Sequence, residues 1–372
     1  MDGRIRSIVA AALSAAFFAA APAAAGPPAP FQEIVEVSEI GGLGRIEVRG
    51  KIGAALQRDE GTVAVLDTSR PTSPKVVGRY DTAQDSLDGD LAFSDDGRWL
   101  FYARQTSNFD EEGVHVLDVS DPANPTLAFY LPAGGAYRVQ YIKQGDAHYL
   151  VLLDAIDGLV VSRFIPETGA LIPVHIDPLP ALKVGGPASA GLFYEPKDPK
   201  LGVPLLYVTT GRTGLQVFDY SDPIQPVQLG AWADIGLAEV EVDATKQSRI
   251  VYAATEYWFD KAIPPEVLAL DATDLGKISV HKRLSTGAAP AEETFVQGMA
   301  LKGRSLYVAQ SGEGLLTFDT RSGRLGRRIR QEGTRNEQSG VMGAPYAYDV
   351  EVVGGSLYLA DAALGTLASI RR

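Results

Sequence analysis

The chain has 372 residues, with 46 acidic and 34 basic side chains, a net charge of −12 and no cysteine. Without cysteine, disulfide bonds and cysteine nucleophiles are excluded. The acidic balance disfavours nucleic acids and anionic membranes as partners, since either would require a basic face.

The first 25 residues have the pattern of a secretory signal peptide. Arg4 and Arg6 precede an apolar run that ends in Ala23-Ala24-Ala25, which predicts cleavage after Ala25. A short membrane anchor is the alternative for this run. Residues 26–32 form a proline-rich spacer, and no later apolar run approaches the length of a membrane span. We therefore expect a periplasmic or secreted protein without a membrane span.

A motif of about twenty residues then recurs along the chain. It reads GVHVLDVSDPANPTLAFYLP at residues 113–132, GLQVFDYSDPIQPVQLGAW at residues 214–232 and GTVAVLDTSRPTSPKVVGRY at residues 61–80. Alternating apolar residues predict two strands, and the prolines between them predict a fixed corner outside the sheet. We expect the aspartate that ends the first of these strands to accept a hydrogen bond from the turn that follows. These residues are Asp67, Asp118, Asp219, Asp271 and Asp319.

Two further strand-like runs precede each copy, which gives four strands per unit with a period of roughly 45 to 50 residues. Seven such units can be counted. The sequence therefore predicts an all-β fold, a seven-bladed β-propeller of four-stranded antiparallel blades, with residues 33–372 forming a single domain. Residues 33–40 are predicted to pair outside residues 366–371, so that an N-terminal strand closes the ring on the C-terminal blade. We expect a monomer.

The motif resembles the LVIVD-repeat proteins, an exported bacterial β-propeller family with an apolar strand followed by D-x-S-D-P-x-x-P. Residues 116–122 (VLDVSDP) and 217–223 (VFDYSDP) carry this pattern closely, and residues 65–74 carry it loosely. The resemblance implies the propeller fold, an exported setting and a role as a scaffold rather than a particular enzyme activity.

Residues 160–171 and 191–220 are also similar to the middle blades of β-propeller phytases. That resemblance implies a calcium-dependent phosphate-ester hydrolase, with Glu239 and Glu256 near calcium and Arg212 near a phosphate. The chain lacks the early DDPAIW-type segment of that family. The hydrolase is the alternative to a non-enzymatic binding scaffold.

Propellers bind ligands at the mouth of the central channel, and polar residues recur at both ends of the strands expected there. The first strands of the blades begin with Arg45, Asp90, Arg138, Glu239, Gln297 and Asp349, among others. The second strands end with Arg104, Asp154, Gln310 and Asp361, among others. We expect two polar rings around one mouth, joined by Trp258 from a long loop. A water-filled channel would also have a polar rim, which is the alternative interpretation.

The mixture of arginine and aspartate in these rings suits a small polar ligand, and the exposed aromatic residues suit a sugar, a peptide or a partner protein. No cofactor is predicted, and calcium is the alternative, because hard oxygen ligands cluster in this region. The calcium candidates are Asp88 and Asp90 from this cluster, and Glu239 and Glu256 from the phytase resemblance. Function is thus predicted as binding of an unknown protein or small polar ligand at the channel mouth.

Overall fold

The computed structural model describes residues 34–36, 43–57, 61–71, 73–82, 88–106, 112–177, 190–211, 213–255, 263–287, 296–329, 347–361 and 366–371. The predicted signal peptide and spacer lie outside these residues. Within them, no helix is long and apolar enough to cross a membrane.

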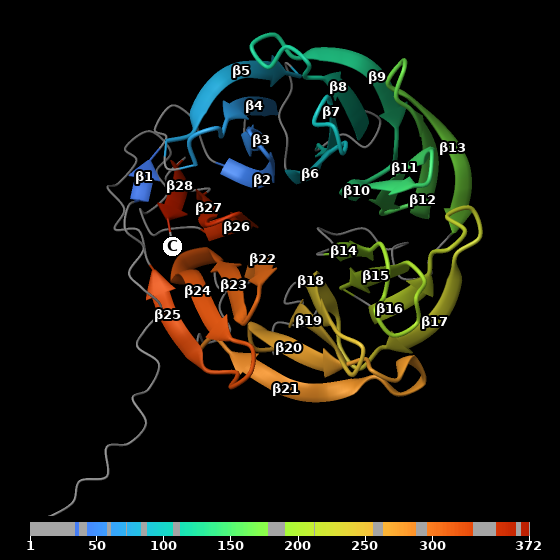
Figure 1. Ribbon diagram of the computed structural model, residues 1–372, viewed down its shortest axis with the longest axis vertical. Helices are drawn as coiled ribbons and strands as arrows, with labels where there is room; N and C mark the ends of the chain where they lie inside the picture. The colour runs from blue at the N-terminus through green and yellow to red at the C-terminus, as the bar shows by residue number, and fades with distance from the viewer. Residues whose placement is uncertain are drawn as a thin grey trace, which may run out of the picture.

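The described residues form seven separate four-stranded antiparallel sheets, arranged as blades around a common axis (Figure 1). Blade 1 consists of β2 (Leu43–Arg49), β3 (Ile52–Gln57), β4 (Thr62–Asp67) and β5 (Lys75–Asp81). Blade 2 consists of β6 (Asp88–Phe93), β7 (Trp99–Gln105), β8 (Gly113–Asp118) and β9 (Thr126–Pro132). Blade 3 consists of β10 (Ala136–Gln144), β11 (Ala147–Asp154), β12 (Gly158–Ile165) and β13 (Ala170–Asp177).

Blades 4 to 6 continue in the same order around the ring. Blade 4 consists of β14 (Ala190–Glu195), β15 (Leu205–Thr210), β16 (Gly214–Asp219) and β17 (Val227–Trp232). Blade 5 consists of β18 (Leu237–Ala244), β19 (Arg249–Thr255), β20 (Glu266–Asp271) and β21 (Ser279–Ser285). Blade 6 consists of β22 (Val296–Lys302), β23 (Ser305–Gln310), β24 (Gly314–Asp319) and β25 (Leu325–Ile329). Blade 7 contains β26 (Ala347–Val353), β27 (Ser356–Asp361), β28 (Thr366–Arg371) and β1 (Ile34–Glu36). Among the described residues, the short 3-10 helices η2 (Leu275–Lys277) and η3 (Ser311–Glu313) lie in loops.

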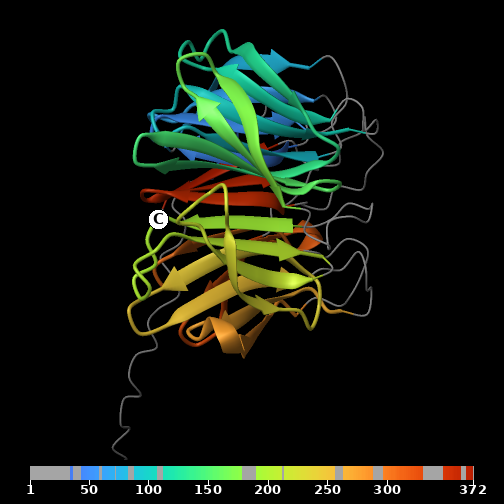
Figure 2. The same ribbon diagram turned by 90° about the vertical axis from the view of Figure 1, so that its right-hand side faces the viewer.

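Each blade has its first strand nearest the axis and its fourth strand at the rim, and Figure 2 shows the blades stacked from the side. The middle strands are buried on both faces because alternate residues contact different neighbours. On β4, Leu66 joins a core with Tyr358 of blade 7, whereas Val65 joins a core with Leu91 of blade 2. The outer strand β5 instead alternates exposed and half-buried residues. Packing between blades therefore supplies most of the hydrophobic core.

The prediction of how the ring closes needs a correction. Residues 33–40 were expected to close the ring by pairing outside residues 366–371. β1 (Ile34–Glu36) pairs with Ala368 to Ile370 of β28 within blade 7, and residues 33 and 37–40 lie outside the described residues. No strand pairing joins one sheet to the next within the described residues, so the structure contains no closed sheet. The fold is an all-β propeller with four-stranded antiparallel blades. Neighbouring blades are held together by side-chain packing and by a few polar contacts, because every hydrogen-bonded ladder ends within its own blade.

The expected role of the aspartate that ends each third strand is confirmed. In each case an Oδ1 atom accepts a hydrogen bond from a backbone N–H two or three residues later, in the turn toward the outer strand. The bonds are Asp67 to Ser69 N at 2.8 Å, Asp118 to Ser120 N at 2.9 Å, Asp219 to Ser221 N at 2.8 Å, Asp271 to Thr273 N at 2.9 Å and Asp319 to Ser322 N at 2.7 Å. The repeated aspartates are structural.

The turns between third and fourth strands also contact the neighbouring blade at glycines of its outer strand. A Cβ atom on Gly78 of β5 would lie 2.1 Å from the carbonyl oxygen of Pro122, in the turn of the next blade. Gly230 of β17 is in the same position, because its Cβ would lie 2.3 Å from the carbonyl oxygen of Leu275. Only glycine allows these two backbones to approach so closely.

We expect Gly78→Ala to lower the free energy of unfolding by about 2 kcal/mol, because the added methyl group meets backbone that must move. The measurement is equilibrium unfolding in urea. Gly355→Ala is the matched control, since no atom lies within 4 Å of its added Cβ. Equal midpoints for the two variants would contradict the close contact between blades 1 and 2.

Candidate functional site

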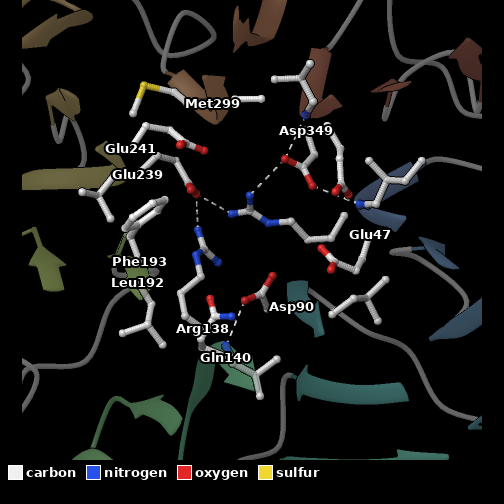
Figure 3. Close-up of a pocket in the computed structure, with 18 of the residues that line it drawn as sticks. Glu47, Asp90, Arg138, Gln140, Leu192, Phe193, Glu239, Glu241, Met299 and Asp349 are labelled. Carbon is white, nitrogen blue, oxygen red and sulfur yellow. Dashed lines mark hydrogen bonds and ion pairs between the residues drawn. The ribbon is translucent and has the colours of Figure 1, made fainter. Parts of the chain in front are cut away.

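The innermost strands of all seven blades surround a central cavity of about 290 Å³ (Figure 3). Its wall follows from the alternation of side chains along these strands, because every second residue of a first strand points toward the axis. The sequence Arg45-Ile46-Glu47 shows the pattern, with polar residues facing the cavity on either side of Ile46, a residue of the core between blades. The cavity therefore has two successive levels of lining side chains.

The first level contains five of the six residues predicted to begin the inner strands. Arg45, Asp90, Arg138, Glu239 and Asp349 all line the cavity. Gln297 does not line it, but its backbone carbonyl accepts a hydrogen bond from Arg45 Nη1 at 3.1 Å. The register of β22 instead places Gly298 opposite Ala309, as Asp349 lies opposite Ala360. The prediction missed this because it selected polar residues, and the equivalent position of β22 is a glycine.

An ion-pair network crosses the first level. Glu239 Oε1 lies 2.7 Å from Arg45 Nη2 and 2.5 Å from Arg138 Nη2, so one carboxylate links blades 1, 3 and 5. Arg45 Nη1 also lies 3.5 Å from Asp349 Oδ1. The three side chains of the Glu239 pairs are 5% to 14% exposed, so water screens their Coulomb attraction less than that of a pair at the surface. This network holds opposite sides of the ring together.

The two aspartates of the first level also bond to the backbone of a neighbouring blade. Asp90 Oδ2 accepts a hydrogen bond from Val139 N at 2.9 Å, and Asp349 Oδ2 accepts one from Ile46 N at 3.0 Å. Burial raises the pKa of Asp90 to about 6, although Arg138 and Arg45 act in the opposite direction. Burial also raises the pKa of Asp349. Both carboxylates thus have an architectural role at the cavity wall.

The second level, two residues further along the inner strands, is acidic and was not predicted from the sequence. It contains Glu47, Glu241 and Glu351, together with Gln140 and Phe193. Glu351 Oε2 accepts a hydrogen bond from Val48 N at 2.8 Å. The signal that could have revealed this level is the repeated spacing of a charged residue, an apolar residue and a glutamate in blades 1, 5 and 7.

The glutamates of the second level have strongly raised pKa values. Burial, together with the charges of Asp90 and Asp349, raises the pKa of Glu47 to about 8. Burial and the charge of Glu239 raise the pKa of Glu241 to about 8. The pKa of Glu351 is also raised, first by burial and then by Glu47. At neutral pH this level therefore holds protons that carboxylic acids in water would have lost.

The predicted second ring does not line the cavity. Its members end the second strands as expected, but they are buried inside the blades because these strands lie between the first and third strands. The exposed fractions are 2% for Arg104, 0% for Asp154, 0% for Gln310 and 1% for Asp361. Asp154 Oδ1 accepts hydrogen bonds from Ile156 N and Asp157 N at 2.7 and 2.8 Å, so this residue stabilises a turn.

The structure does not place the remaining predicted site residues at the cavity. Trp258, Glu256 and Arg212 lie outside the described residues, and Asp88 is described only by its backbone pairing with Gln105. Within the described part of the chain, no group of three or more histidine, cysteine, aspartate or glutamate side chains is arranged to hold a metal ion. Calcium binding therefore stays a prediction.

Comparison with known proteins confirms the resemblance that the repeated motif carries. The family model for the LVIVD repeat matches residues 59–82 and 109–131, which fall in blades 1 and 2. No curated protein matches the sequence. Among solved structures, the chain is similar to the β-propeller domain of Cps50 (Swd1) from Myceliophteria thermophila, with 13% identity and a TM-score of 0.61. The match covers 93% of this chain and 100% of that domain, and it shows a shared fold.

Proposed function

We propose that this β-propeller with LVIVD repeats is an exported binding module that holds a small polar ligand in its central cavity. The observation that carries the proposal is the concentration of charged side chains at the axis. Every ionisable residue that lines the cavity is an arginine, an aspartate or a glutamate, and they come from five different blades. Polar groups that converge in one concave site are typical of ligand binding.

The wall of the cavity is also fixed in position, which favours binding of a defined ligand. Glu239 is held by two arginines, and Asp90 and Asp349 are held by backbone N–H groups of adjacent blades. A ligand that enters such a site meets side chains whose conformational entropy has already been lost. We do not propose phosphate-ester hydrolysis, because Glu239 is bonded to arginines and Glu256 and Arg212 lie outside the described residues.

The proposal is tested by measuring the melting temperature of the mature protein with a panel of amines, amino acids, sugars, phosphate esters and calcium chloride. A ligand of the folded state raises the melting temperature with its concentration. We expect a ligand that acts in this way to lose its effect in Gln140→Leu, which changes the cavity wall. Gln247→Leu, at an exposed turn, is the matched control and should keep the effect.

A binding site elsewhere on the molecule would give equal shifts in both variants, which would contradict the proposal. The proposal would also be contradicted if no member of the panel raised the melting temperature and the partners of the protein bound wild type and Gln140→Leu equally. Phosphate release in the same samples tests the hydrolase independently.

A further inference from the structure

The cavity has an unbalanced charge. Six carboxyl side chains line it, from Glu47, Asp90, Glu239, Glu241, Asp349 and Glu351, against the two guanidinium groups of Arg45 and Arg138. Both arginines are paired with Glu239, and each also donates to a backbone carbonyl. Both guanidinium groups are thus paired with oxygen atoms of the first level. The excess of carboxyl groups lies mainly in the second level.

Two carboxyl groups of the second level have no partner among the described residues. The side chains of Glu47 and Glu241 make no hydrogen bond and no ion pair with this part of the chain, although every other carboxyl group in the cavity makes at least one. Figure 3 shows these two side chains on opposite sides of the cavity. Both side chains are half-buried beside other carboxyl groups, and a charged carboxyl group is unfavourable in such surroundings, which favours protonation or pairing with a cation.

The shape of the site distinguishes between kinds of cation. The carboxyl groups of the described residues are not grouped closely enough to hold a metal ion. They surround a cavity of about 290 Å³, which has room for a molecule of several heavy atoms. Leu192, Phe193 and Met299 also line it, and an aromatic ring together with aliphatic side chains suits the alkyl part and the charge of an organic ammonium ion.

We propose that the second level of the cavity binds a small organic ammonium ion, with Glu47 and Glu241 as its counter-charges and Phe193 as an apolar wall. This inference rests on the proposed function and names the class of ligand. The ammonium group supplies the positive charge that the two side chains lack, and each carboxyl group that pairs with it releases its proton to solvent. Binding is therefore coupled to proton release.

The other charged groups near these glutamates act against ionisation in the empty cavity. Asp90 and Asp349 raise the pKa of Glu47 and only Arg49 lowers it, while Glu239 and Asp349 raise the pKa of Glu241. Glu351 is influenced by both glutamates and by Asp349. A cation in the cavity reverses this balance, because it stabilises every one of these negative charges at once.

The test is isothermal titration calorimetry of the mature protein with putrescine, which carries two ammonium groups and stays charged at pH 6.5 and pH 8.5. With a pKa of about 8, the ionised fraction of a carboxyl group rises about 25-fold between these two values. We expect putrescine affinity to rise by at least about that factor. Repeating the titration at pH 7.5 in buffers of different ionisation enthalpy should show proton release.

Glu241→Gln should weaken putrescine binding and reduce both the pH dependence and the number of protons released. Glu167→Gln removes an exposed carboxylate on blade 3 and should change neither. Binding of putrescine without proton release, or unchanged binding in Glu241→Gln, would overturn the proposal. So would calcium chloride binding tightly with proton release when putrescine does not bind.

The failure of this inference can be separated from failure of the proposed function. If putrescine does not bind at either pH, but another ligand of the panel raises the melting temperature in wild type and not in Gln140→Leu, the cavity is a binding site for a different class of ligand. If no ligand depends on the cavity wall, both proposals are wrong.

Discussion

Asp198→Ala should lower the free energy of unfolding by about 3 to 5 kcal/mol, the cost typical of leaving a buried charge without its partner. Asp198 lies in the loop between β14 and β15 of blade 4, and its Oδ2 is 3.0 Å from Arg249 Nε and 2.5 Å from Arg249 Nη2 of blade 5. The two side chains are 0% and 1% exposed. Without the carboxylate, the guanidinium keeps only its bond to the carbonyl of Ala272 among described groups.

Equilibrium unfolding in urea measures this effect. Arg304→Ala is the control, because its pair with Asp319 is 2.8 Å long but exposed, at 64% and 37% of the two side chains, and should contribute less than about 1 kcal/mol. If the unpaired charge causes the loss, Asp198→Ala combined with Arg249→Met should be more stable than Asp198→Ala alone. A double variant that is less stable than the single variant would contradict this explanation and indicate lost packing.

The internal order of a blade could be predicted because the repeat contains both a period and a turn. In blade 4, Asp219 marks the end of the third strand and accepts the hydrogen bond of the turn from Ser221 N. Pro223 follows as a residue that cannot donate to the next ladder of backbone hydrogen bonds. The same local chemistry returns in other blades, so the alternation of strands follows without knowledge of distant contacts.

The candidate site was predicted less completely, because it depends on register and depth. The first level was found at Asp90 and Asp349, which are polar, and missed at Gly298, where the register equivalent to Asp349 is occupied by a glycine without a side chain to mark it. The residues at the ends of the second strands look equally polar in sequence. Whether Asp154 faces the axis or the interior of a blade depends on the position of its strand within the sheet, which polarity alone does not encode.

The acidic second level is the opposite case, a set of site residues that the sequence did not predict. Glu47 and Glu241 have the alternation of ordinary surface residues on half-exposed strands, and the repeated charged-apolar-glutamate spacing marks their position in the repeat but not their burial. Their unusual environment arises only when seven inner strands converge on one axis.

The convergence of these glutamates predicts that the protein loses stability as the pH rises above neutral. The pKa of Glu47 and of Glu241 is about 8 in the folded protein, against about 4.5 for an ordinary glutamate. The folded state therefore binds more protons than the unfolded state, and the resulting stabilisation is complete below about pH 4.5 and is lost as the pH rises through 8. Between pH 7 and pH 9 each group should remove about 1.4 kcal/mol.

Urea unfolding at pH 7, 8 and 9 should thus show a loss of about 3 kcal/mol in wild type and a much smaller loss in Glu47→Gln/Glu241→Gln. His115 does not contribute to the stability change between pH 7 and pH 9. Burial lowers its pKa to about 4, so it is neutral in both the folded and the unfolded state above pH 7. Glutamine retains the shape and polarity of a protonated glutamate, so the double variant should match wild type at pH 7 and exceed its stability at pH 9. A double variant with the pH dependence of wild type would show that these two carboxyl groups ionise normally, and that the electrostatic description of the cavity is wrong.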